Sequence, residues 1–506
     1  MATLLGIDNG LTVTKAVLFD ADGTVLAIAR RRVPQSRPRP RHVERDMEGL
    51  WDAAAEAIRE AIERSGRPAS DIAGIAATAH GDGLYALDRE GRPLGPGILS
   101  LDSRAHDVVA RWEADDLPAR ALELTGQAPH ASAPSALLAW VQRREPERLA
   151  RIGHILAAKD WLRYRLTGTI GTDRTEASTS FTNVRTQDYD RDALDLYGLD
   201  GLWDALPPVA ACDEIIGSVT VKAARETGLV AGTPVMAGLH DVTASALGIG
   251  AHRPGTVGIV AGTYSINEVV AAEPRSDPRW FCRNGILPGE WNAMAISPAS
   301  TANYDWFLDT LASAERERAE AAGTTIHGAL APEIEAALAS PTSILFHPYL
   351  FGSPYGAGAS ASFLGLRGWH RRGDMIAAVL EGIAHNHRHH VDALGDGFTF
   401  TEARLTGGAS RNPLVAQLFA DVLGRPVIAS ATEEAAAWGA ALCAGSGVGL
   451  FDTPLDDPRD LAATERRHEP DPATRAMRDE RHVLHLRAAR GLRDLWPDLD
   501  ALGGKA

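Results

Sequence analysis

Two similar stretches, one near the start of the chain and one near its middle, decide the fold. Residues 6–17 read GIDNGLTVTKAV and residues 258–269 read GIVAGTYSINEV; laid together without gaps they share four residues, two of them glycine. Each stretch reads as a strand, a glycine turn and a second strand. A hairpin of this kind at the head of each half of the chain predicts two related domains.

The residues around the first stretch predict a mixed sheet covered by helices. Residues 3–8, 12–20 and 24–33 read as three strands joined by glycine turns, which makes an antiparallel meander. Residues 47–64 then place apolar side chains at helical spacing, and residues 72–79 (IAGIAATA) read as a buried strand. A meander followed by alternating helix and strand predicts an α/β protein.

The composition is that of an ordinary globular protein. The chain has 506 residues, 45% hydrophobic and 23% charged, with 49 Gly, 29 Pro and 3 Cys. These values exclude disordered, collagen-like and disulfide-stapled proteins. Because Cys212, Cys282 and Cys443 form no CxxC pair, we expect neither a zinc knuckle nor a redox motif, and a reducing cytoplasm fits best.

The charge and the start of the chain exclude several kinds of partner. A formal net charge of −15 repels the phosphate backbone of nucleic acid. The one basic stretch, residues 30–41, is broken by proline, which favours a solvated loop over a phosphate-binding role. The start has no basic region followed by an apolar segment, and no stretch approaches about 18 apolar residues. We therefore expect no nucleic acid, no membrane span and no export.

The first candidate for binding chemistry is the turn Asp8-Asn9-Gly10, with Thr12 and Lys15 beside it. A glycine turn lets backbone N–H groups approach phosphate oxygens, Thr12 adds a hydroxyl donor, and Asp8 can hold Mg²⁺ through water. A plain hairpin turn is the alternative reading, because Asn-Gly is a preferred turn sequence.

Gly262 and Thr263 offer the same chemistry from the other half of the chain. Neither GxxxxGK[ST] nor GxGxxG occurs, so a P-loop and a simple dinucleotide site are both excluded. One such turn is weak support for phosphate binding. Two matched turns favour a protein that holds a polyphosphate between two domains.

His240 and Asp241 follow an expected strand (234–238) and begin an expected Ala-rich helix. Asp is a favoured N-cap, and the field at that cap would keep its carboxylate ionised. A carboxylate at this strand end can instead accept the proton of a substrate hydroxyl during phosphoryl transfer. The residues alone leave the structural and the catalytic roles equally open.

The segment RLTGGASRNPLVAQLFADVLGRPVIAS (404–430) reads as strand, turn and helix. The strand runs into Gly407-Gly408, Asn412 is a good N-cap before Pro413, and Gly424 ends the helix. Paired glycines at a strand end let a flat base lie against the backbone, although such units are common without a ligand.

Four histidines, in EGIAHNHRHH, lie at positions 385, 387, 389 and 390. Two of them, His385 and His389, are one helical turn apart and could share a metal. No Cys or acidic residue is placed to complete a ligand set. A solvated or core-edge helix face is therefore favoured.

These segments together resemble the FGGY carbohydrate kinases over roughly residues 3–450. Their order and spacing carry the resemblance; the segments are GIDNGLTVTKAVLFD, VERDMEGLW, KDWLRYRLTG, GLHDVTASALGIG, VAGTYS, LEGIAHNHR and LTGGASRNPLVAQLFADVLGRPV. AHGDGLYALD (79–88), LSLDSRA (99–105) and 172–190 are most similar to the L-xylulokinase branch, with erythritol-type polyol kinases close behind. The resemblance implies the two-domain actin-like ATPase (ribonuclease H-like) α/β fold, with ligands in the interdomain cleft.

The stretch GIGAHRPG at 248–255 is typical of a domain junction. With the resemblance, it predicts a sugar-binding domain at 1–248, an ATP-binding domain at 249–450 and a helical extension at 451–506. The chain departs from many family members at Gly352-Ser353-Pro354, where they carry Gly-Glu-Arg.

The resemblance also implies a role for individual residues. Asp241 falls on the catalytic base, and Asp8 on the aspartate linked to the metal. The other positions are the first phosphate loop, Asn9, Gly10, Thr12 and Lys15; the second phosphate loop, Gly262 and Thr263; the adenosine site, Gly407, Gly408 and Asn412; and the sugar site, His80, Asp82, Asp102, Arg104 and His240.

The sequence thus predicts a kinase that uses ATP and Mg²⁺ to phosphorylate a hydroxyl of a small sugar or polyol, a ketopentose of the L-xylulose or xylulose type. An erythritol or polyol kinase of the same family is one alternative. A sugar-sensing protein without turnover is another, although the presence of both Asp8 and Asp241 argues against it. The oligomeric state stays open, with a homodimer among the alternatives.

Overall fold

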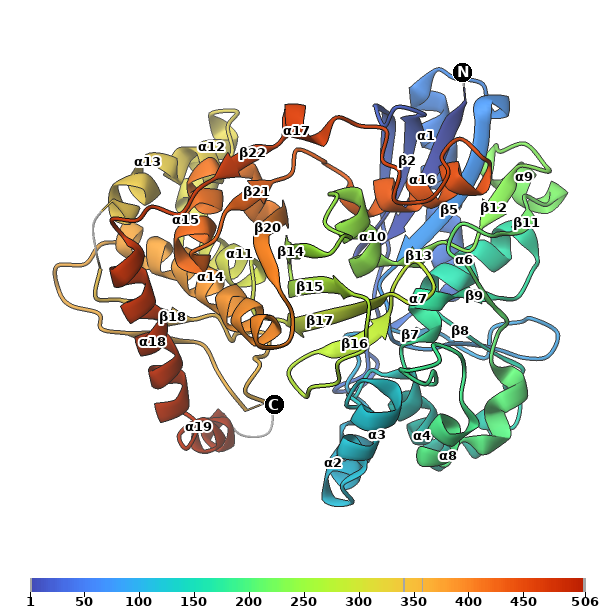
Figure 1. Ribbon diagram of the computed structural model, residues 1–506, viewed down its shortest axis with the longest axis horizontal. Coiled ribbons are helices and arrows are strands. Elements are labelled where there is room, and N and C mark those ends of the chain that lie inside the picture. The colour runs from blue at the N-terminus through green and yellow to red at the C-terminus, as the bar shows by residue number, and fades with distance from the viewer. Residues whose placement is uncertain (1, 340–341, 357, 504–506) are drawn as a thin grey trace. The chain divides into compact units, whose positions relative to one another are not determined.

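The computed structural model describes residues 2–339, 342–356 and 358–503 (Figure 1). The chain forms two compact units. The first unit contains the residues up to Arg253, together with Val270–Ala293 and Thr432–Asp460. The second unit contains Pro254–Val269, Met294–Ala431 and the residues from Leu461 onward.

The units interleave along the chain, whereas the sequence suggested continuous domains that divide at 248/249 and 450/451. The difference arises because helix α16 (Ala435–Gly447), late in the chain, packs on the first unit's sheet. A Cβ on Gly6 would lie 2.0 Å from the carbonyl oxygen of Ala437, so only glycine allows this close packing of helix on strand.

The first unit is built on a mixed sheet with the strand order β11-β12-β5-β1-β2-β3, and β13 also pairs with β5. The meander expected at the start of the chain is confirmed, because β1 pairs antiparallel with β2 and β2 with β3. Strand β5 pairs parallel with β1, and β13 pairs parallel with β5. The strands are β1 (Thr3–Asn9), β2 (Val13–Asp20), β3 (Val25–Arg32), β5 (Ile72–Ala79), β11 (Ile215–Ser218), β12 (Pro234–Met236) and β13 (Leu239–His240).

Helices cover both faces of this sheet. Alternate residues of a strand point to opposite faces, so Leu5 and Ile7 pack in one apolar cluster with helix α1 (Met47–Ser65), while Leu4 packs with α16 in another. The sequence predicted α1 correctly, and the Asp46 side chain caps it by accepting a hydrogen bond from the Gly49 N–H (3.0 Å).

The rest of the first unit is largely helical, as the sequence indicated. Its further helices are α2 (His106–Ala114), α3 (Leu117–Thr125), α4 (Pro134–Arg144), α5 (Pro146–Leu149), α6 (Ala158–Thr167), α7 (Arg174–Ala177), α8 (Arg191–Leu196), α9 (Val221–Thr227) and α10 (Asp241–Gly248). Short strands join them: β4 (Glu44–Arg45), β6 (Tyr85–Leu87), β7 (Gly97–Ile98), β8 (His154–Leu156), β9 (Thr172–Asp173), β10 (Val209–Ala210) and β16 (Phe281–Asn284).

The second unit is built on strands in the order β17-β15-β14-β20-β21-β22. Strand β14 pairs antiparallel with β15 and parallel with β20. The bounds are β14 (Gly255–Ala261), β15 (Ser265–Ala271), β17 (Trp291–Ser297), β20 (Phe400–Gly407), β21 (Val427–Ala429) and β22 (Arg466–His468).

The hairpins that open the two units are equivalent. Strands β1 and β2 leave residues 10–12 as their turn, and β14 and β15 leave 262–264, which are the positions that the gapless comparison matches. In each unit the first strand pairs antiparallel with the second and parallel with a later strand. The expectation of two related halves therefore holds at the level of strand topology.

Helices surround the second unit's sheet. Helix α14 (Arg372–Gly397) carries the four histidines, and three of them (His385, His387 and His390) are buried, so this face lies in the core and is not solvated. The other helices are α11 (Ala302–Leu311), α12 (Ser313–Ala321), α13 (Ile326–Leu338), α15 (Pro413–Leu423), α17 (Leu461–Thr464), α18 (Arg475–Gly491) and α19 (Trp496–Gly503), and a hairpin is formed by β18 (Leu345–His347) and β19 (Ser362–Leu364).

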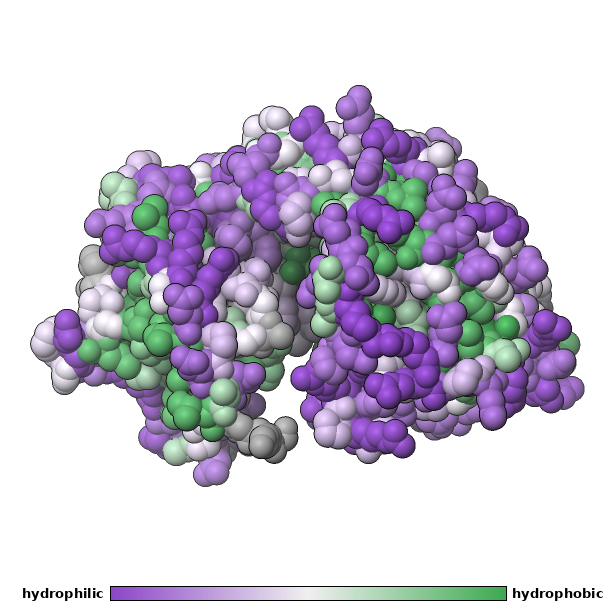
Figure 2. All heavy atoms as spheres, turned by 90° about the horizontal axis from the view of Figure 1, so that it is seen from below, coloured by the Kyte–Doolittle hydropathy of each residue, from purple (hydrophilic) through white to green (hydrophobic). Residues whose placement is uncertain are grey.

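On the face that Figure 2 shows, hydrophilic side chains cover most of the area, and smaller apolar areas lie between them. Over the described part of the chain, no helix combines the length and the apolar character that a bilayer crossing requires.

Candidate active site

The C-terminal ends of three parallel strands meet at one edge of the first unit's sheet. In register, Asn9 of β1 pairs with Ala79 of β5, and Ala79 pairs with His240 of β13. The N–H of His80 donates to the Asn9 carbonyl (3.0 Å), so the loops that follow these strands begin side by side. Ligands of open α/β sheets bind at this edge.

The β1–β2 hairpin carries a buried charge cluster. The Lys15 Nζ lies 3.1 Å from the Asp8 carboxylate and 2.9 Å from that of Glu434. Burial opposes the charge on Lys15, but these two carboxylates outweigh it and raise the pKa of Lys15 above its ordinary value. Lys15 therefore stays protonated, and it fixes the carboxylate of Asp8 at the strand end.

The turn of this hairpin is held from within. The N–H of Gly10 donates to the Val13 carbonyl (3.0 Å), so this amide closes the turn and does not point outward. The buried side chain of Arg45 donates to the carbonyls of Gly10 (3.4 Å) and Leu11. Arg45 was not among the residues expected at the site, and it supports the turn that carries Thr12.

His80, Gly81 and Asp82 follow β5. A Cβ on Gly81 would lie 1.7 Å from the Nε2 of His240, so only glycine lets the two loops come this close. Asp82 adopts a left-handed backbone (φ 57°), which costs about 1–3 kcal/mol at a non-glycine residue and is concentrated at functional sites. Burial, with the charge of Arg45, lowers the pKa of His80 to about 3, so His80 is neutral.

Asp82 forms an ion pair with Arg283, a residue that the sequence analysis missed. The two side chains lie 2.9 Å apart, and Arg283 also donates to the Gln127 side chain (2.9 Å). Burial opposes ionisation of Asp82, but the positive charge of Arg283 and the proximity of His130 keep the pKa of Asp82 below its usual range. Asp82 is thus an ionised hydrogen-bond acceptor at neutral pH.

His240 and Asp241 connect β13 to α10. The helix begins at Asp241, and its N-cap is His240, whose Nδ1 accepts a hydrogen bond from the Val242 N–H (3.3 Å). The expectation that Asp241 caps the helix is therefore wrong, because the neighbouring imidazole fills that position. The carboxylate of Asp241 is left for other chemistry.

We also expected the field at the helix start to keep the Asp241 carboxylate ionised, and this expectation is wrong in direction. The side chain is 30% exposed, yet loss of water and the negative charge of Asp8 raise the pKa of Asp241 from 3.8 to about 7. The nearby backbone N–H of Val242 lowers this pKa but does not outweigh them. Asp241 can therefore gain and lose a proton near neutral pH.

Asp102 and Arg104 lie apart from these strand ends, in the loop after β7. Asp102 accepts hydrogen bonds from the Val43 N–H (2.6 Å) and from Arg104 (2.8 and 2.9 Å), and Arg104 also pairs with Glu44 (2.7 Å). Both side chains are buried, and Arg104 packs over the Trp140 ring. Their charges are compensated within this loop.

The second unit brings its own glycine loops together. Ala261 of β14 pairs with Gly407 of β20, so the loops at Gly262-Thr263 and Gly407-Gly408 leave the same sheet edge. The Gly262 carbonyl accepts hydrogen bonds from the N–H (2.9 Å) and hydroxyl (2.7 Å) of Thr301. A Cβ on Gly262 would meet nothing within 4 Å, so the space beside this backbone is open.

The segment after β20 folds as the sequence predicted. Gly407 has φ 90°, a short 3₁₀ turn follows, and the Asn412 side chain caps α15 by accepting from the Leu414 N–H (3.0 Å). Pro413 is the first helical residue and Gly424 ends the helix in the left-handed region. The paired glycines thus lie between a strand end and a helix start, beside the Gly262 loop.

A metal site built from protein side chains alone is not found in the described ranges, where no three His, Cys, Asp or Glu residues are placed to hold one. The buried histidines of α14 are used in packing: Nδ1 and Nε2 of His387 each lie 3.1 Å from a serine hydroxyl, those of Ser265 and Ser300. The favoured reading was a solvated or core-edge face; burial of three of the four histidines excludes the solvated one.

Comparison with known proteins identifies the chain. Residues 3–248 match the N-terminal domain of the FGGY family of carbohydrate kinases, and residues 257–448 match its C-terminal domain. The chain belongs to this family. It is a carbohydrate kinase with the two-domain actin-like fold, as the resemblance of its motifs predicted.

Similar proteins cover nearly the whole chain. The L-xylulose/3-keto-L-gulonate kinase of Escherichia coli (strain K12) is 33% identical over 492 residues, 96% of each protein. The erythritol kinase of Brucella abortus (strain 2308) is 30% identical over 518 residues, 98% of this chain and 97% of that protein. The crystal structure of xylulose kinase from Rhodospirillum rubrum has a TM-score of 0.85 and 30% identity, covering 98% of this chain and 99% of that one.

Proposed function

We propose that this FGGY kinase transfers the γ-phosphoryl group of ATP to a hydroxyl of a small uncharged sugar, a ketopentose of the xylulose type. The observation that carries the proposal is that two carboxyl groups of different character follow strands at one edge of the first unit's sheet. The pKa of Asp241 is about 7, whereas Asp82 is an ionised acceptor.

Asp241 serves as the general base. A base is most effective when its pKa lies near the working pH, because it is then ionised and still able to take a proton. The raised pKa of Asp241 meets this condition, and its N-cap neighbour His240 fixes the start of α10 independently. Asp241 accepts the proton of the attacking sugar hydroxyl.

The carboxylate of Asp8 fits a divalent cation. It lies at the same sheet edge as Asp241, and Mg²⁺ is usually bound by one or two carboxylates together with water and substrate phosphates. When bound, Mg²⁺ supplies charge neutralisation for the transferring phosphoryl group. Lys15 holds the Asp8 carboxylate at the strand end for this purpose.

The second unit supplies the nucleotide site. Backbone groups at Gly262 and the hydroxyl of Thr263 bind phosphate oxygens, and the Gly407-Gly408 turn with the Asn412 helix start takes the adenosine. Open space beside Gly262 supports this assignment, because a phosphate needs direct access to the backbone. Asn9, Gly10 and Thr12 form the matching hairpin in the first unit.

The sugar binds at the loops of the first unit. Ionised Asp82 accepts hydrogen bonds from sugar hydroxyls, and the neutral rings of His80 and His240 lie beside it. The paired charges of Asp102 and Arg104 fix the neighbouring loop, so we assign them a supporting role.

A polyol kinase is the second candidate, and the erythritol kinase relative favours it. An ADP-release assay with purified protein, ATP and Mg²⁺ separates the two when ketopentoses, tetritols, hexuloses and glycerol are compared by kcat/KM. The ketopentose should give the highest value. A clear preference for a tetritol would transfer the assignment to the polyol kinases, and sugar-independent background with every compound would refute turnover on these sugars.

A further inference from the structure

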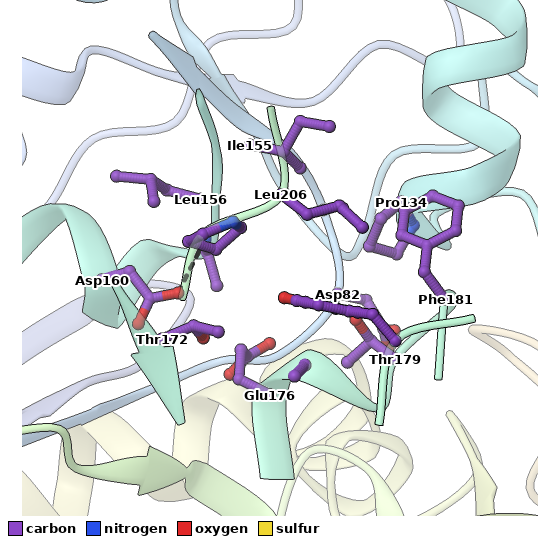
Figure 3. A pocket seen from close by; sticks show the side chains of 15 residues that line it. Asp82, Pro134, Ile155, Leu156, Asp160, Thr172, Glu176, Thr179, Phe181 and Leu206 are labelled. Atoms are coloured by element: carbon purple, nitrogen blue, oxygen red, sulfur yellow. Dashed lines mark hydrogen bonds between the residues drawn. The ribbon is translucent and has the colours of Figure 1, made fainter. Parts of the chain in front are cut away.

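A cavity of about 40 Å³ lies in the first unit next to Asp82. By this measure a water needs about 10–15 Å³, so the cavity has room for roughly three water-sized groups, or for a hydroxymethyl group. Side chains from several elements line it, and Figure 3 shows Glu176 and Thr179 on the side opposite Ile155 and Leu206.

The ionisable side chains that line this cavity are all acidic. Asp82, Asp160 and Glu176 contribute three carboxyl groups, and none of the described residues that line the cavity is Lys, Arg or His. The nearest cations are already engaged: Arg283 pairs with Asp82, and Lys159 pairs with Asp160 (2.6 Å). An anionic group in this cavity would meet no compensating charge.

Glu176 contributes a buried polar atom that has no hydrogen-bond partner. The residue is 5% exposed, and its Oε2 atom is buried without a hydrogen-bond partner among the described residues. Figure 3 shows its carboxyl group directed into the cavity. A buried polar atom without a partner costs about 1–3 kcal/mol, so a ligand that completes its bonding is favoured.

The surrounding charges determine the protonation of Glu176. The Lys159 Nζ is shared by Asp160 and Asp173, at 2.6 and 2.8 Å. Burial, reinforced by these two carboxylates and opposed by Lys159, raises the pKa of Glu176 well above its ordinary value. The raised pKa favours the protonated form of Glu176, an uncharged carboxylic acid that can donate one hydrogen bond and accept others.

The segment that carries Glu176 is joined to the catalytic loop. The hydroxyl of Thr175 donates to Asp173 (2.6 Å) and accepts from the His240 N–H (2.9 Å), immediately before Asp241. Asp82 also links the two places, because it lines the cavity and influences both Glu176 and Asp241 electrostatically. A sugar bound with one hydroxyl at Asp241 and the next ones at Asp82 extends toward this cavity.

We propose that the cavity receives the end of the sugar remote from the phosphorylated hydroxyl, and that Glu176 donates a hydrogen bond to an oxygen there. The inference rests on the proposed function and adds its selectivity: the remote end must carry an uncharged hydroxyl or carbonyl group. A sugar acid with a carboxylate at that end is rejected, because three carboxyl groups face it and no cation does.

The first test needs no variant. The ADP-release assay compares a ketopentose with its deoxy analogue, which lacks the hydroxyl furthest from the phosphorylated carbon, and with a keto-sugar acid carrying a carboxylate at that end. We expect kcat/KM to fall about 10- to 100-fold for the deoxy analogue and by a larger factor for the acid. Equal values for the ketopentose and its analogue would overturn the inference.

The second test changes Glu176 itself. Glu176→Gln keeps an uncharged donor and acceptor and should stay within about threefold of the parent. Glu176→Leu removes the hydrogen bond, and we expect KM for the ketopentose to rise about 10- to 100-fold with little change in kcat, because the contact is remote from the reacting hydroxyl. Glu113→Leu, at an exposed glutamate of α2, is the control and should behave like the parent.

The leucine variant also tests selectivity. Discrimination between the ketopentose and its deoxy analogue should disappear in Glu176→Leu and persist in Glu176→Gln. An unchanged KM in Glu176→Leu, or unchanged discrimination, would show that the cavity holds water only. If Glu176→Leu does not fold, the inference is tested by the comparison of the ketopentose with its deoxy analogue and by the kinetics of Glu176→Gln. A preference for sugar acids would overturn this inference alone, whereas background ADP release with every sugar would overturn the proposed function.

Discussion

Replacing Asp241 by Asn separates catalysis from stability at a single position. The amide has nearly the size of the carboxyl group but cannot take a proton, so turnover should fall by about 10²–10⁴-fold. The helix should survive intact, because the N-cap of α10 is the imidazole of His240 and not the carboxylate that is changed.

The same change should stabilise the protein above neutral pH. The folded state raises the pKa of Asp241 from 3.8 to about 7, so the folded protein holds this proton in a pH range where the unfolded chain has released it. Folding stability is therefore lost as pH rises from about 4 to about 7. Three pKa units correspond to about 4 kcal/mol, and screening by water at the 30% exposed side chain reduces the expected gain to about 1–2 kcal/mol.

The assay measures turnover and the thermal midpoint together, at pH 8 and at pH 5. A gain of about 1–2 kcal/mol corresponds to a rise of about 1–3 °C at pH 8, and the rise should shrink at pH 5. Asp46→Asn is the matched control: its side chain caps α1 through the Gly49 N–H, a bond that an amide oxygen can also accept. Turnover of Asp241→Asn near that of the parent would refute the assignment of the base, and a lower midpoint at pH 8 would refute the charge argument.

Two further predictions concern the second unit. Gly262→Val should fold normally, because a Cβ there meets nothing within 4 Å. It should weaken binding of a non-hydrolysable ATP analogue about tenfold or more, since the side chain stands where we expect phosphate to approach the backbone. If calorimetric titration gives the parent affinity, this loop does not bind the nucleotide. His387 has a pKa lowered to about 3 by burial, so the unfolded chain takes up its proton first as pH falls from 6.5 toward 3 and stability is lost over that window. His387→Gln should reduce the difference between the urea midpoints at pH 7.5 and pH 5.5, and an unchanged difference would assign the acid sensitivity to other groups.

The parts of the fold that could be predicted are those encoded by local sequence. The two hairpins, helix α1 and the strand–turn–helix unit around Asn412 depend on turn glycines, caps and apolar spacing, all of which act within about 20 residues. The equal turns at 10–12 and 262–264 also let a short comparison place the boundaries of both hairpins.

The parts that could not be predicted depend on pairing across long stretches of chain. Arg283 reaches Asp82, 201 residues earlier, and α16 returns to the first sheet after the chain has formed most of the second unit. Nothing near Arg283 in the sequence marks it as the partner of a site carboxylate. Glu176 lies in the segment 172–190, which contributed to the family resemblance. Its proposed role in sugar binding depends on which charged groups surround it, and only the assembled structure shows these groups.

The electrostatics of Asp241 differ from what its place in the sequence suggested. Its place after a strand and at a helix start suggested a cap that keeps the carboxylate ionised. In the structure His240 takes the cap, and burial together with the charge of Asp8, which lies on β1 two strands from β13, raises the pKa of Asp241 instead. Burial and the same neighbour that we propose for cation binding thus bring the proposed base to a pKa near neutrality.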